Sequence, residues 1–153
     1  MRITCILTTI CTVLLLSCCS SEKSIEKKNI KEIAFNYEQA LGNFDVESAE
    51  KYACKETKEH TLTVAKAMVK RVDRKYLESD LPATIKITNI QLTSDTTATA
   101  KWHKTTPRSK KSGTLELRKR NGKWQAFDPI KNIQRSQDKE KDATDTLSGA
   151  TKE

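Results

Sequence analysis

Residues 114–127 read TLELRKRNGKWQAF, and this stretch decides the fold. An Asn-Gly pair between two segments of alternating apolar and polar residues is a strong signal for a two-residue β-hairpin turn. Counting outward from residues 121–122 gives three cross-strand pairs: Arg120 with Lys123, Lys119 with Trp124, and Leu117 with Ala126. Because side chains alternate between the faces of a strand, Trp124 and Ala126 share one face with the two leucines. This apolar face predicts that the hairpin packs on a core.

The alternation continues upstream to Pro82 and predicts two more antiparallel strands. The apolar residues of the first strand form two pairs of opposite parity: Ile85 with Ile87, and Ile90 with Leu92. All four reach one face only if the strand slips by one residue near Thr88-Asn89, which predicts a β-bulge. After a three-residue turn at 93–95, the second strand continues the apolar face with Ala98, Ala100 and Trp102. The sheet therefore has four strands, and the bulge bends it.

Helical periodicity precedes the sheet. It predicts a first helix over 24–42, a short second helix capped by Asp45, and a third helix over 57–78. Their apolar stripes are Ile30, Ile33, Ala34, Tyr37 and Leu41 in the first; Val46, Ala49 and Ala53 in the second; and Leu62, Ala65, Met68, Val69, Val72 and Tyr76 in the third. We therefore expect an α+β fold in which three N-terminal helices pack on a curved four-stranded antiparallel sheet.

Two segments carry a family resemblance. Residues 40–50 combine a helix end with Gly-Asn-Phe-Asp and Val-Glu-Ser-Ala-Glu, and residues 121–124 read Asn-Gly-Lys-Trp. Over about residues 27–129 the chain resembles the nuclear transport factor 2-like (cystatin-like) superfamily, and more narrowly small Bacteroidetes lipoproteins of unknown function. The resemblance implies a cone of helices and curved sheet, often with a pocket, which some members use for isomerase or dehydratase chemistry and others for binding or dimerisation. Unlike longer members, this sequence shows no strand between the second and third helices.

The N-terminal segment predicts the cellular location of the protein. Residues 1–17 place a basic residue before an apolar run that is too short to span a membrane, which is the layout of an export signal peptide. The sequence Leu-Leu-Ser-Cys that ends at Cys18 resembles the lipobox of bacterial lipoproteins, where the signal is removed before a lipid-modified cysteine. We expect Cys18 to carry palmitate-type acyl chains that anchor the protein to a membrane of the bacterial cell envelope. Cys19 is the alternative anchor, and an ordinary cleaved signal is the alternative leader.

After the signal peptide, the chain divides into a lipid-anchored tether (18–24), the α+β domain (25–133) and a polar tail (134–153). The tail has too few apolar residues to fold alone, so we expect it to be disordered. The short tether predicts that the domain lies close to the membrane surface, on either its periplasmic or its outward side. Cys54 is expected to be a small buried side chain, since no disulfide framework is possible.

Few residues suit catalysis. His60 falls on the outer flank of the third helix and His103 on the outer face of the second strand, so we expect neither in a catalytic or metal site. Asp128, just after the last strand, is the one carboxylate that we expect near the rim of the cone. The sequence has neither a Gly-rich phosphate loop nor a nucleophile elbow. We therefore expect no catalytic residue, no metal and no cofactor.

Four aromatic residues point inward or toward the rim of the cone: Tyr37, Tyr52, Trp102 and Trp124. They either fill the core or line an apolar pocket with a few polar tips. Phe35 lies on the opposite side of its helix from the apolar stripe, where it packs on the tether or on a partner.

Positive charge gathers in one part of the chain, where nine basic residues and one acid, Glu116, lie between residues 101 and 123. Parity places four of them on the outer sheet face: Lys101, Arg118, Arg120 and Lys123. Four others belong to the adjoining loop: Lys104, Arg108, Lys110 and Lys111. Such a basic face either attracts anionic lipid or glycan or simply keeps the protein soluble.

These features favour a non-enzymatic binding or interaction module on a membrane, with an anionic lipid or glycan as partner. We expect no nucleic acid, because the aromatic residues that would stack on bases face the core. The alternative is a small pocketed enzyme of the isomerase or dehydratase type, which needs an enclosed wet cavity holding a desolvated carboxylate or histidine. A structural dimer through the outer face is disfavoured by its cations, and the sequence leaves the oligomeric state open.

Overall fold

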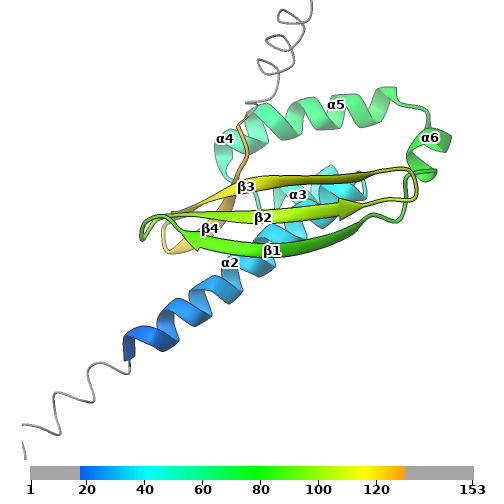
Figure 1. Cartoon of the computed structure of the whole chain (residues 1–153). Coiled ribbons are helices and arrows are strands. Elements are labelled where there is room, and N and C mark those ends of the chain that lie inside the picture. The colour runs from blue at the N-terminus through cyan, green and yellow to red at the C-terminus, as the bar shows by residue number, and fades with distance from the viewer. Residues whose placement is uncertain (1–17, 130–153) are drawn as a thin grey trace, which may run out of the picture.

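A 25-residue helix, α2 (Cys18–Gly42), lies across one face of an antiparallel sheet of order β1-β2-β3-β4 (Figure 1). The computed structural model describes residues 18–129, with side chains from residue 22 onward. The other helices are α3 (Val46–Glu50), α4 (Lys55–Thr57), the π-helical turn η1 (Lys58–Leu62), α5 (Thr63–Arg71) and α6 (Arg74–Glu78). The strands are β1 (Thr84–Leu92), β2 (Thr97–Thr105), β3 (Lys110–Arg120) and β4 (Lys123–Phe127). The expected α+β fold is confirmed.

The β3–β4 hairpin has the predicted register. Arg120 pairs with Lys123, Lys119 with Trp124, and Leu117 with Ala126. Asn121 and Gly122 have φ values of 51° and 74°, which give the left-handed turn that matches the twist of a hairpin. The predicted bulge is also present, because the register of β1 against β2 shifts between Ile87 and Asn89.

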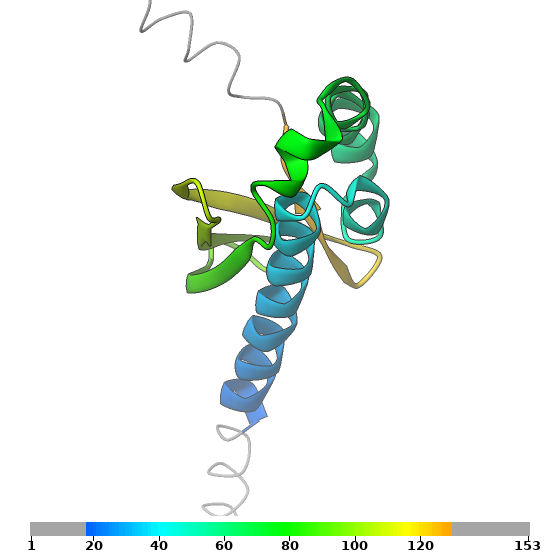
Figure 2. The same cartoon turned by 90° about the vertical axis from the view of Figure 1, so that its right-hand side faces the viewer.

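The core lies between α2 and the sheet face that it covers, which we call the inner face. The buried residues of α2 include Ile30, Ala34 and Tyr37, and those of the inner face include Ala98, Ala100, Leu115, Leu117, Trp124 and Ala126. Seen end-on to the sheet, α2 runs past the strands and carries α3 to α6 beyond its C-terminal end (Figure 2). The inner face packs mainly against the C-terminal half of α2, from Ile30 onward, while most of residues 22–29 are exposed.

Two helix predictions need correction. Residues 18–24, expected as a tether, form the first turns of α2. The third helix is not continuous over 57–78, because α5 ends at Arg71, Val72 is extended, and the Asp73 side chain caps α6. The stripe that should have been buried also opens to solvent, since Met68 is 61% and Tyr76 56% exposed. Periodicity shows which side of a helix is apolar but not how far the core beneath it extends.

The turn after α2 depends on a close approach of Gly42 to the side chain of Ala83. A Cβ on Gly42 would lie 2.9 Å from the Cβ of Ala83, so α2 can meet the start of β1 only through a glycine. The left-handed residue that redirects the chain is Phe44, with φ 60°, and Asp45 caps α3 as predicted by accepting a hydrogen bond from the Ser48 amide. Where no strand was expected, Ala53 forms a single parallel bridge to Ala126.

The signal peptide and the polar tail lie outside the described residues, as does the side chain of Cys18. Within residues 18–129, no helix combines the length and apolar character that crossing a membrane requires.

Candidate functional site

A pocket of about 790 Å³ lies between the C-terminal end of α2 and the inner face of β2 and β3. Its wall on α2 consists of Glu38, Leu41 and Gly42, and Asp128 closes one side just after β4. The strands contribute Trp102, Lys104, Lys111, Ser112, Gly113, Thr114 and Leu115. The cavity has the size of a small-molecule site, and its lining is more polar than apolar, with charged groups from α2, β2, β3 and the segment after β4.

Gly113 gives the pocket its depth. It pairs with Trp102 across β2 and β3, and a Cβ at this position would lie 2.5 Å from Cζ2 of the indole. The Trp102 ring therefore packs directly on the Gly113 backbone. A side chain at residue 113 would push the ring into the cavity.

Glu38 is the most unusual side chain in the pocket. It is only 8% exposed, yet no hydrogen bond or ion pair holds its carboxyl among residues 22–129. Burial raises the pKa of this carboxyl to about 8, and the negative charge of Asp128 adds to the rise, while Lys104 opposes it. Since no buried side-chain oxygen of the described residues lacks a partner, the Glu38 carboxyl oxygens reach the open space of the pocket. An acid with a raised pKa in a cleft is a candidate functional group.

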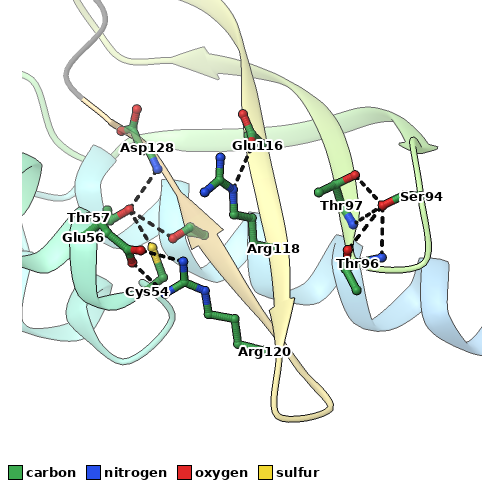
Figure 3. Close-up of polar contacts among 11 residues, drawn as sticks. Cys54, Glu56, Thr57, Ser94, Thr96, Thr97, Glu116, Arg118, Arg120 and Asp128 are labelled. Carbon is green, nitrogen blue, oxygen red and sulfur yellow. Dashed lines mark hydrogen bonds and ion pairs between the residues drawn. The ribbon is translucent and has the colours of Figure 1, made fainter.

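Asp128 is held at the rim by three contacts. Its backbone amide donates to Thr57 Oγ1 at 2.9 Å (Figure 3), its carbonyl accepts from Thr61, and its carboxylate accepts from the Tyr37 hydroxyl at 3.3 Å. Thr57 is itself fixed, because it donates to the carbonyl of Ala126 at 3.2 Å. Burial raises the pKa of Asp128, and the Tyr37 hydrogen bond works against that rise. The expectation that Asp128 lies near the rim is confirmed.

The predicted positions of Lys104 and Lys111 are wrong. Both were expected in a loop, but they lie in β2 and β3, directly opposite each other on the inner face. Both line the pocket, and neither ammonium lies within 4.0 Å of a carboxylate in the described part of the chain. Lys110 is also in β3 rather than in the loop, which is limited to residues 106–109 and retains Arg108.

The outer sheet face is less positive than its sequence suggests. Arg118 is paired with Glu116 at 3.0 Å, and Arg120 makes two bonds to the Glu56 carboxylate at 2.9 and 2.5 Å (Figure 3). In the loop, Arg108 stacks on Tyr76 and donates to Ser79. Of the four cations predicted on the outer face, Lys101 and Lys123 are exposed and make no ion pair within residues 22–129, and Lys110, which was predicted in the loop, is likewise exposed without an ion pair there.

The four predicted pocket aromatic residues do not share one site. Trp102 lines the pocket, but Trp124 lies near the other end of the inner face, where its indole donates to Glu26 at 3.1 Å. Tyr37 is fully buried, and Tyr52 is half-buried against the core. His60 and His103 are exposed, as predicted, and Cys54 is a buried free thiol. Phe35 lies on the side of α2 away from the apolar stripe and is 39% exposed.

Glu38 was not predicted as a site residue, although its position in the helical pattern indicates one. It lies four residues after Ala34 and three before Leu41, which places it at the edge of the apolar stripe of α2. An acid in that position either reaches past the core or faces a cavity. Within residues 18–129, no group of three His, Cys, Asp or Glu side chains is placed to hold a metal ion.

No known protein-family model matches the chain, and no curated protein matches it significantly. Three solved structures are similar in arrangement. The first is an NTF2-like protein from Campylobacter jejuni, with a TM-score of 0.49 and 18% sequence identity over 64% of this chain and 96% of that one. The second is an NTF-2 like protein of unknown function from Shewanella oneidensis, with a TM-score of 0.47 and 18% identity over 65% of this chain and 92% of that one. The third is a ketosteroid isomerase-like protein from Erwinia carotovora, with a TM-score of 0.43 and 16% identity over 66% of this chain and 90% of that one. Since all three TM-scores are below 0.5, the α+β fold stands on the observed elements and strand register.

Proposed function

We propose that this protein is a lipid-anchored protein of the bacterial cell envelope that binds a small molecule, without transforming it, in the pocket between α2 and the inner face. The observation that carries the proposal is Glu38, a largely buried side chain whose carboxyl makes no hydrogen bond or ion pair among residues 22–129 and opens into a cavity of about 790 Å³. We place binding here rather than on the outer face, because the two outer arginines already have acidic partners.

The proposed anchor gives α2 a second role. If Cys18 carries the lipid, Glu38 lies 20 residues further along one helix, which is about 30 Å at 1.5 Å per residue. The pocket is then held away from the bilayer by a rigid spacer and opens to molecules in the surrounding compartment. Metabolic labelling with a palmitate analogue tests the anchor: wild type and Cys19→Ala should be labelled and Cys18→Ala should not. Equal labelling of Cys18→Ala overturns this assignment.

The pocket is tested by a ligand-observed NMR fragment screen on the mature chain, with Gly113→Val as the closed variant. Valine at this position drives the Trp102 ring into the cavity, so fragments that bind wild type should lose most of their signal change. Thr99→Val, on the outer face of β2, is the matched control and should bind as wild type does. If no fragment binds wild type, or if Gly113→Val binds equally well, the pocket is not the site.

A second candidate function, a small acid–base enzyme, is favoured by one observation. A carboxyl with a pKa of about 8 beside Asp128 can exchange a proton near neutral pH, which general acid–base catalysis requires. Fragments that bind should be incubated with wild type and with Glu38→Gln in D₂O and followed by NMR. Deuterium incorporation or a new product that depends on Glu38 supports an enzyme, and unchanged ligand supports binding alone.

A further inference from the structure

We propose that the pocket takes a small organic acid, whose carboxylate lies between Lys104 and Lys111 and whose apolar body packs against Trp102. This inference rests on the proposed small-molecule function and adds the chemical class of the ligand. It follows from the pairing of the two lysines, the state of the nearby acids and the composition of the wall.

The two lysines are placed to attract an anion, with Lys104 half-buried and Lys111 exposed at the pocket. Lys104 and Lys111 face each other directly across β2 and β3, and like charges in that arrangement destabilise a sheet. Arg118, Lys119 and Arg120 of β3 each have an acidic partner, whereas neither of these two makes an ion pair within the described residues, although the charge of Lys104 acts on the Glu38 carboxyl. The Lys104 stem runs close to the backbone at Gly42, where a Cβ would meet its Cδ at 3.5 Å. A carboxylate between the two ammoniums would offset their repulsion.

The acids of the pocket favour a single negative charge on the ligand. Glu38, from α2, is faced by Asp128 after β4, by Lys104 of β2 and by Tyr37 of its own helix. Since burial raises the pKa of Glu38 to about 8, its carboxyl is mostly protonated at neutral pH, and it can donate a hydrogen bond instead of repelling an anion. The charge of Asp128 raises the pKa of Glu38, and the same negative charge disfavours a doubly charged phosphate more than a carboxylate.

The rest of the wall suits an apolar body. Leu41 from α2 and Leu115 from β3 line the pocket together with the indole of Trp102. A cavity of about 790 Å³ is much larger than a carboxylate alone, so the remainder of the ligand fills the space against these three side chains. The site therefore fits an amphipathic acid rather than a free inorganic anion.

Isothermal titration at pH 6.5 with four probes that share one body tests the inference: phenylacetate, phenylacetamide, phenyl phosphate and phenethylamine. We expect phenylacetate to bind wild type at least tenfold more tightly than the other three. Lys104→Gln and Lys111→Gln should each lose at least tenfold in affinity for it. Lys101→Gln, an exposed lysine on the outer face of β2, is the matched control and should bind as wild type does.

The pH dependence gives a second readout. Affinity for phenylacetate should fall above pH 8, where Glu38 becomes charged, and this fall should be absent in Glu38→Gln. Preference for the amide, the amine or the phosphate, or full binding by both lysine variants, overturns the inference and leaves small-molecule binding standing. Absence of binding by all four probes also overturns it, while the fragment screen decides the proposed function independently.

Discussion

The two ends of the inner face use the same kinds of residue in opposite ways. Toward the N-terminal end of α2, Glu26 accepts from Lys119 at 2.6 Å and from the Trp124 indole at 3.1 Å. Toward its C-terminal end, Glu38 lies near a tryptophan and a lysine of the sheet but makes no hydrogen bond to either. One acid is part of the packing, and the other is open to a cavity.

The pKa values of the two acids move in opposite directions for this reason. The hydrogen bond from Lys119 lowers the pKa of Glu26, whereas burial raises that of Glu38 to about 8. Glu26 is hydrogen-bonded within the fold, whereas the Glu38 carboxyl is open to the cavity and to water. The N-terminal end of the inner face therefore contributes to stability, whereas the C-terminal end leaves a carboxyl open to a cavity.

The largest expected effect is the loss of packing at the closed end. Trp124 is 4% exposed and belongs to the core, so Trp124→Ala should lower the free energy of unfolding by about 3–5 kcal/mol. Trp102→Ala should cost clearly less, because Trp102 is half-buried and one side of it borders the pocket. Urea denaturation followed by circular dichroism measures both. An equal loss for the two variants would contradict the distinction between the ends.

The next effect is the pH dependence that Glu38 imposes on stability. Because its pKa is raised from 4.5 to about 8, the folded protein binds this proton more tightly than the unfolded chain does. The stabilisation is complete below pH 4.5 and is lost as the pH rises toward 8, with a slope of at most about 1.4 kcal/mol per pH unit. Denaturant unfolding between pH 5 and 8 should show this decline in wild type and a flatter profile in Glu38→Gln. A decline of equal size in the variant would assign it to another group.

A smaller effect of opposite sign is expected at Glu26. Its pKa is lowered, so its contribution is present above pH 4.5 and is lost as the pH falls through the lower folded value. Because the pair with Lys119 is partly exposed, Glu26→Gln should cost only about 1 kcal/mol at pH 7. Glu32→Gln, at an exposed position on the same helix, is the control and should leave the unfolding free energy unchanged.

The sheet could be predicted closely because its determinants are local. The Asn-Gly turn fixes the hairpin register, and the change of parity between Ile87 and Ile90 requires a bulge. Alternation did not reveal that β2 extends to Thr105 or that β3 begins at Lys110, because beyond Trp102 the inner positions carry lysine instead of apolar residues. The same reading of lysine as a loop residue hid Lys104 and Lys111.

Glu38 illustrates a different limit. Its position at the edge of the apolar stripe is visible in the sequence, but whether that edge meets packed side chains or a cavity depends on the space between α2 and two strands. Trp102, for example, leaves the cavity open only because residue 113 is a glycine that lets the indole lie flat. Packing contacts such as that of Trp102 on Gly113 involve several elements at once. The periodicity of one segment does not describe them.

The smallest effect tests whether the open end is strained when no ligand is bound. Lys111→Gln removes one of two like charges that face each other across β2 and β3, so it should raise the free energy of unfolding by about 0.5 kcal/mol. Lys110→Gln, the neighbouring exposed lysine on the outer side of β3, should change it by less. Thermal unfolding at low salt measures the difference, which should shrink at high salt because screening weakens the repulsion. If Lys111→Gln instead destabilises the ligand-free protein, its ammonium already has a stabilising partner, and the two ends of the inner face are more alike than the hydrogen bonds indicate.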